Sequence, residues 1–79
     1  NNYQNDIYYQ RLCEKIGEKH PIEVLTLLAV LRICKGKKNL AEAGKILFSN
    51  DTNPSSRIRK FLHKFNLKWE DVNEIIGQL

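Results

Sequence analysis

The feature that most restricts the fold of this chain is a nearly continuous apolar segment, residues 22–34. Its only polar residues are Glu23, Thr26 and Arg32. Pro21 precedes it and suits the first position of a helix, where a missing N–H costs nothing. The Leu and Ala content, without a turn signal, favours a helix over a buried strand. We therefore predict a helix that is buried on most sides and must be covered by the rest of the chain.

Two shorter amphipathic helices are predicted on either side of this segment. Residues 6–19 place apolar side chains at helical spacing, in one stripe formed by Tyr8, Tyr9, Leu12, Cys13 and Ile16. After Gly36, which suits the left-handed position that closes a helix, Asn39 stands three residues before Glu42. This pair is a variant of the capping box and predicts the start of a short helix. The residues predicted to face inward from it are Leu40, Ala43, Ile46 and Leu47.

Two further helices are predicted in the last third of the chain. Asn53 and Pro54 are an N-cap and first-position pair that opens a helix over residues 54–65, with Ile58, Phe61, Leu62 and Phe65 at helical spacing. The pattern repeats over residues 69–79 in Trp69, Val72, Ile75, Ile76 and Leu79. The sequence thus predicts an all-α fold, a compact bundle of about five helices in a single domain that spans residues 1–79.

The chain has no Met and begins Asn1-Asn2-Tyr3, so we expect it to be a fragment of a longer protein. No segment has the order of basic, apolar and small residues that marks a signal peptide. The longest apolar run, residues 24–31, is too short to span a bilayer. We therefore expect a cytoplasmic, nucleoid-associated protein with no membrane partner.

Catalytic and metal-binding patterns are not found, so no enzyme activity, cofactor, metal or small-molecule substrate is expected. His20 and His63 have no paired ligands or nearby nucleophile, and His20 is better explained as a cap for the helix at Pro21. The two cysteines, Cys13 and Cys34, form no CxxC motif and are predicted to be small buried residues. The glycines form no phosphate-binding loop. Acidic residues at the start of the last helix favour its dipole without a catalytic role: Glu70, Asp71 and Glu74.

The positive charge of the chain is concentrated in its middle. The net charge is +4, yet residues 35–64 hold eight basic residues against only Glu42 and Asp51. On the predicted helix 54–65 the basic residues fall on the side away from the apolar residues, in the stripes Arg57-Lys60-Lys64 and Ser56-Arg59-His63. A basic helix face can neutralise nucleic-acid phosphates and release their counterions. The alternative is a solvated surface without a partner.

Residues 21–67 resemble the Fis-type helix-turn-helix, the DNA-binding unit of nucleoid proteins and of many activators. The strings that carry the resemblance are KGKKNLAEAGKIL and RIRKFLHKFNL. In that family a long apolar helix ends in a basic turn with Gly, an Asn opens a short helix with Ala at its tight packing point, and a basic helix follows. The corresponding parts here are residues 22–34, 35–38, Asn39, Ala43 and 57–64.

The chain departs from this family in the turn between the two helices. The segment between Leu47 and Ile58 is roughly four residues longer than the family's tight turn, and Phe48 replaces the expected Gly. This difference bears on the angle at which the second helix enters a groove. The last helix, residues 69–79, lies beyond the family pattern.

The resemblance implies a non-enzymatic DNA-binding domain in transcription regulation, replication or nucleoid or plasmid maintenance. Its recognition helix would be residues 54–65, lying in the major groove of double-stranded DNA. Arg57 would read bases, because a guanidinium can bond a guanine edge with two hydrogen bonds. Ser55, Ser56 and Lys60 are secondary base-reading candidates. Phosphate contacts are expected from Lys37, Lys38, Asn39, Arg59, His63 and Lys64.

Three other binding modes are considered. An apolar side with Tyr3, Ile7 and Tyr8 would allow a homodimer, which demands a palindromic site. The alternative function is a helical protein-interaction module of a larger assembly, with an acidic protein partner bound through the last helix or the Tyr-rich N-terminus. RNA binding is disfavoured, because Phe61 and Phe65 have core spacing and are not placed for stacking on bases.

Overall fold

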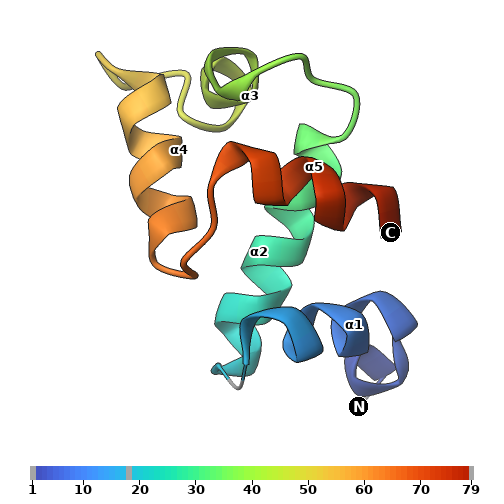
Figure 1. Cartoon of the computed structure of the whole chain (residues 1–79). Helices are drawn as coiled ribbons and strands as arrows, with labels where there is room; N and C mark the ends of the chain where they lie inside the picture. The colour runs from blue at the N-terminus through green and yellow to red at the C-terminus, as the bar shows by residue number, and fades with distance from the viewer. Residues whose placement is uncertain (1, 18, 79) are drawn as a thin grey trace.

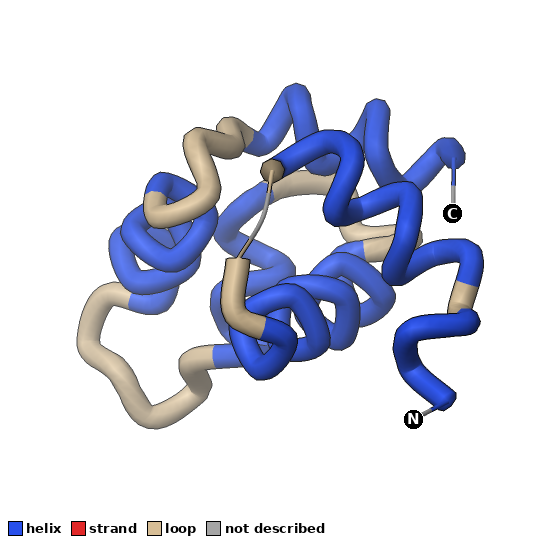
Figure 2. Tube along the Cα trace, turned by 90° about the horizontal axis from the view of Figure 1, so that it is seen from below, coloured by secondary structure: helices blue, strands red, loops and turns tan. Residues whose placement is uncertain are grey.

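The computed structural model describes residues 2–17 and 19–78, and in them every regular element is helical (Figures 1 and 2). A short 3₁₀ helix, η1 (Asn2–Asn5), is followed by α1 (Ile7–Ile16), α2 (Pro21–Cys34), α3 (Leu40–Leu47), α4 (Pro54–His63) and α5 (Trp69–Gln78). The predicted all-α bundle of about five helices is confirmed. Its α-helical segments fall where the apolar periodicity predicted them, with small differences at their ends.

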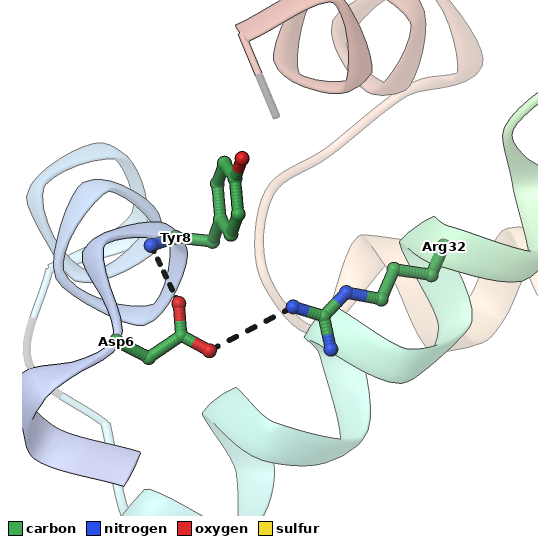
Figure 3. A network of polar contacts seen from close by, with 3 residues as sticks. All are labelled: Asp6, Tyr8 and Arg32. Atoms are coloured by element: carbon green, nitrogen blue, oxygen red, sulfur yellow. Dashed lines mark hydrogen bonds and ion pairs between the residues drawn. The ribbon is translucent and has the colours of Figure 1, made fainter. Parts of the chain in front are cut away.

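The end of α1 is set by a glycine. Gly17 has φ of 81°, which a residue with a side chain rarely adopts, and its N–H donates to the carbonyl of Cys13. The helix therefore ends before the predicted limit at Lys19. At its start the Asp6 carboxylate accepts a hydrogen bond from the Tyr8 N–H at 2.8 Å. The other Asp6 oxygen lies 3.7 Å from the Arg32 guanidinium, so this cap also links α1 to α2 (Figure 3).

Helix α2 is the centre of the molecule, and α5 crosses it while α1 lies at its N-terminal end (Figure 1). One side of α2 fills the core with Val24, Leu27, Leu28, Leu31 and Cys34. The prediction that α2 is buried on most sides is wrong, since Ile22, Leu25 and Ile33 are 73%, 38% and 40% exposed. These three side chains lie on one stripe, because their spacing of three and eight residues returns to the same face of a helix.

Helices α3 and α4 pack against each other and begin with the same kind of cap. The Asn39 side chain accepts from the Glu42 N–H at 2.9 Å, and the Asn53 side chain accepts from the Ser56 N–H at 3.2 Å. Both predicted N-caps are confirmed. The Glu42 carboxylate completes the capping-box variant by accepting from the N–H of Lys38, one residue before the cap. His20 does occupy the N-cap position of α2, but its side chain makes no capping hydrogen bond.

Other predicted core positions differ in burial. Ile46, expected to face inward from α3, is 50% exposed, whereas Ala43 is fully buried. Cys34 is buried as predicted, but Cys13 is only half-buried at the edge of the core. Val72 and Ile75 of α5 are buried, and Leu79 lies outside the described residues. None of the helices described is long and apolar enough to cross a membrane.

Candidate nucleic-acid interface

One face of α4 is basic and exposed along its length. Ile58 and Leu62 on the opposite face are 0% and 1% exposed and anchor the helix in the core. This anchoring fixes the rotation of the helix, so the side of α4 away from the two anchors faces solvent. The exposed residues are Arg57, Arg59, Lys60, His63 and Lys64. The structure thus brings the two predicted basic stripes together on a single solvent-facing surface, here called the α4 basic face.

The cations of this face differ in the ion pairs and ring contacts that they make within the protein. Arg57 Nε lies 3.2 Å from Asp51 Oδ2, and its guanidinium lies 5.6 Å from the centre of the Phe48 ring. Lys64 Nζ lies over the Phe61 ring at 5.6 Å. For Arg59 and Lys60, no ion pair occurs within the part of the chain that the structure describes. These two are therefore the cations whose charge is least compensated.

Arg57 is predicted to read bases, but in the structure its guanidinium already pairs with Asp51. The Arg57 and Asp51 side chains are 58% and 40% exposed. An ion pair at this exposure contributes no more than about 1 kcal/mol, since water screens it. The turn that connects α3 to α4 therefore holds Arg57 only weakly, and the guanidinium can exchange this carboxylate for another acceptor.

The other residues predicted to contact DNA lie in the first turn of α4 and just before α3. Ser55 and Ser56 are half-buried in the first turn of α4, and the Ser56 N–H is used in the Asn53 cap. Lys38 is exposed and Lys37 is half-buried. The Asn39 side-chain oxygen is occupied by the Glu42 N–H, so this residue positions α3 and has only its amide nitrogen for a phosphate.

The first residue of α3 and the second half of α4 line one groove. Leu40, the residue after Asn39, lines it together with Arg59, Lys60 and His63. The groove therefore joins the start of α3 to the second half of α4, although residues 48–53 and most of α3 separate them in the sequence. Lys37, Lys38 and Asn39 precede Leu40 in the chain and are not among the described residues that line the groove.

A residue that the sequence analysis missed, Gly44, sets the distance between α3 and α4. A Cβ built on Gly44 would lie 2.8 Å from the Pro54 carbonyl oxygen and 2.9 Å from its carbon. The tight packing point predicted at Ala43 thus falls one residue later, although Ala43 is itself buried. A glycine in the middle of a helix pattern is the signal, because glycine there is unfavourable unless packing requires it.

The described residues include few side chains suited to metal binding or nucleophilic chemistry. No set of three or more His, Cys, Asp or Glu side chains is placed to hold a metal ion in residues 2–17 and 19–78. Burial raises the pKa of the Cys34 thiol, because desolvation disfavours the thiolate. This thiol is therefore a poor nucleophile near neutral pH.

The surface predicted for a homodimer is smaller than expected. The Tyr3 ring packs edge-to-face on the Tyr9 ring with centroids 5.1 Å apart, and the half-buried Tyr8 lies under the Arg32 guanidinium at 6.0 Å. Only Ile7 of the three predicted residues is exposed, at 51%. The tyrosines of this region therefore serve contacts within the chain.

Comparison with known proteins gives a family. Neither the curated proteins nor the solved structures yield a match to the chain. The family model for the RtcR C-terminal DNA-binding domain matches residues 4–72, which run from the second half of η1 to the first residues of α5. This match agrees with the predicted class of helical DNA-binding domain and does not single out the Fis type. Because it covers most of the 79 residues, the chain belongs to the family of RtcR C-terminal DNA-binding domains.

Proposed function

We propose that this chain binds double-stranded DNA in transcription regulation and that α4 is its recognition helix. In this proposal α3 and α4 act as a relaxed helix-turn-helix of the Fis type, and residues 1–79 form one domain that works on DNA in the cytoplasm. The observation that carries the proposal is the α4 basic face, in which Arg59 and Lys60 are exposed and free of ion pairs among the described residues. The family's DNA-binding character supports it.

The proposed contacts follow from the place of each side chain. Arg59, Lys60, His63 and Lys64 lie along the middle and end of α4, where cations neutralise phosphates and release counterions. Lys37, Lys38 and Asn39 add phosphate contacts from the start of α3. These contacts fix the position of the helix on the duplex without reading its sequence.

Base reading is proposed for the first turn of α4, with Arg57 as the main residue. Its exposed pair with Asp51 stabilises by at most about 1 kcal/mol, whereas a bidentate contact to guanine discriminates by about 1–3 kcal/mol. The small loss from giving up the Asp51 carboxylate therefore does not prevent Arg57 from turning to a guanine edge once α4 lies in the major groove. Ser55 and Ser56 are the secondary base-reading residues, and Lys60, a third candidate from the sequence, is assigned to the phosphates in this proposal.

The proposal predicts a strong dependence of DNA affinity on salt. With about four to six phosphate contacts, the plot of log K against log salt should have a slope of roughly −4 to −5 for a duplex. Fluorescence anisotropy of labelled duplex and single-stranded DNA, titrated at two or more salt concentrations, measures this slope. Absence of binding, or binding that does not change with salt, would remove the proposal.

We further propose that the chain dimerises through the exposed stripe of α2. Ile22, Leu25 and Ile33 leave an apolar helix face uncovered, and burial of each side chain in a dimer would stabilise it by about 1–2 kcal/mol. A two-fold dimer would read two half-sites about one helical turn of DNA apart. Sedimentation equilibrium should show a dimer for the unchanged chain and a monomer for Ile33→Asp. A single monomeric species at all concentrations, free and on DNA, would refute this part.

A further inference from the structure

A groove between the end of α4 and the start of α5 has an apolar lining that the function proposed above does not use. It has a volume of about 650 Å³, within the range of sites that enclose a ligand or a few side chains of a partner. Its apolar lining, here called the floor, comes from the first residue of α3, the end of α4, the segment between α4 and α5, and the first residue of α5. The floor residues are Leu40, Leu62, Leu67 and Trp69.

The rim of this groove is cationic. Arg59 and Lys60 border it from α4, and Lys68 borders it from the segment that leads into α5. The neutral His63 and one acid, Glu70, complete the polar lining among the described residues. No ion pair engages the side chains of Arg59, Lys60 or Lys68 in the described parts of the chain. An apolar floor bordered by three cations and one acid is complementary to a ligand with an apolar centre and an acidic margin.

We propose that this groove docks an acidic amphipathic helix of a partner protein. A helix that carries Leu or Phe on one stripe and Asp or Glu beside it offers apolar side chains to the floor and carboxylates to the rim, the helix-in-groove mode of recognition. DNA is less suited, because its phosphates can pair with the cations of the rim but cannot bury the apolar floor. A second copy of this chain is disfavoured, because its own surplus of positive charge would meet the same cations.

The docked helix and DNA exclude each other, a statement that rests on the proposed function. Arg59, Lys60 and His63 belong both to the rim and to the α4 basic face. A carboxylate paired with Arg59 or Lys60 occupies the position that a phosphate would take. An acidic partner therefore lowers the affinity of the chain for DNA, and DNA lowers its affinity for the partner by the same factor.

The docking is tested first without DNA. The probe is a synthetic peptide of about four helical turns, with Leu and Phe at i, i+3 and i+4 spacing and Asp or Glu elsewhere. Trp69 is the only tryptophan of the chain, so its fluorescence reports on the groove floor. The peptide should shift the Trp69 emission, and two control peptides should bind at least about tenfold more weakly, one scrambled to break the apolar stripe and one with every acid as its amide.

Matched variants separate the groove from the rest of the surface. Leu40→Gln should weaken peptide binding about tenfold or more, because it removes a floor residue, whereas Ile46→Gln on the same helix should leave it unchanged. Lys68→Gln should weaken binding about two- to fivefold, and Lys35→Gln, which removes the same charge elsewhere, should not. Thermal melts establish that each variant is folded. Equal effects of Leu40→Gln and Ile46→Gln, or equal binding of the scrambled peptide, overturn the docking proposal.

The second arm measures competition in DNA anisotropy. Addition of the peptide should displace labelled duplex, and a complex that holds both ligands overturns the exclusion. If the chain binds no DNA, the Trp69 titration still decides whether the groove docks the peptide. A Trp69 shift that duplex alone produces and that Leu40→Gln abolishes, without peptide binding, assigns the groove to DNA and overturns the proposal.

Discussion

Replacement of Arg59, Lys60 and Lys64 together by alanine should weaken binding to duplex DNA by roughly 10²- to 10³-fold at about 0.1 M salt. Each phosphate contact contributes about 0.9 to the slope of log K against log salt, so three lost contacts should flatten that slope by about 2.7. The three side chains are exposed on α4, and none contributes to the core, so the variant should keep its fold. Anisotropy titrations of both proteins across a salt series measure the affinity and the slope.

The control for this result removes the same charge from another part of the molecule. Arg11, Lys15 and Lys19 are exposed and lie at α1 and the turn after it, outside the proposed interface. Their joint replacement by alanine should lower affinity by less than about tenfold and leave the slope nearly unchanged, because distant charges are screened. Equal losses in the two triple variants would mean that net charge alone drives binding and that α4 has no special role.

Gly44→Ala should destabilise the domain by about 1–2 kcal/mol, the second large effect. Helix propensity alone would favour alanine by about 1 kcal/mol. The new Cβ would lie 2.8 Å from the Pro54 carbonyl oxygen, which is backbone and cannot rotate away, so α3 and α4 must separate. Because the contacted atoms are backbone, we expect a cost at the upper end of the range for overpacking, about 2–3 kcal/mol, which leaves a net loss of about 1–2 kcal/mol. A thermal melt should show a midpoint lower by about 4–15 °C for a domain of this size.

Gly77 is the matched control, since a Cβ there meets no atom within 4 Å. Gly77→Ala should leave the midpoint unchanged or raise it by a few degrees, about 0.5 kcal/mol. DNA affinity should fall for Gly44→Ala and not for Gly77→Ala, because only the former changes the angle between α3 and α4. A Gly44→Ala variant as stable as the unchanged protein would mean that α3 does not approach α4 as closely as the structure has it.

The helices of this fold could be predicted from sequence because their signals are local. A cap needs one side chain and a backbone N–H three residues away, so Asn39 and Asn53 marked the starts of α3 and α4 correctly. The apolar period of α4 likewise fixed which of its faces is buried. Since the charged residues fall on the other face, the exposure of Arg59 and Lys60 followed from the same pattern.

Features that depend on the packing of whole elements could not be predicted in this way. Ile46 and Ile33 are as apolar as their buried neighbours, and only the absence of a covering helix in the described chain leaves them exposed. The pairing of Arg57 with Asp51 depends on the path of the long turn, residues 48–53, for which the sequence has no periodic signal. The groove at Trp69 likewise forms only when three helices are packed together, so the sequence of no single segment predicts it.

The measurement that tests the account most directly is a map of amide chemical shifts while duplex DNA is titrated into the ¹⁵N-labelled chain. The account predicts that the largest shifts fall on residues 55–64 and 37–39, with only small changes along α1. Shifts that gather on α1 or on the far end of α5 and leave Arg59 and Lys60 unchanged would contradict the assignment of α4 to the DNA.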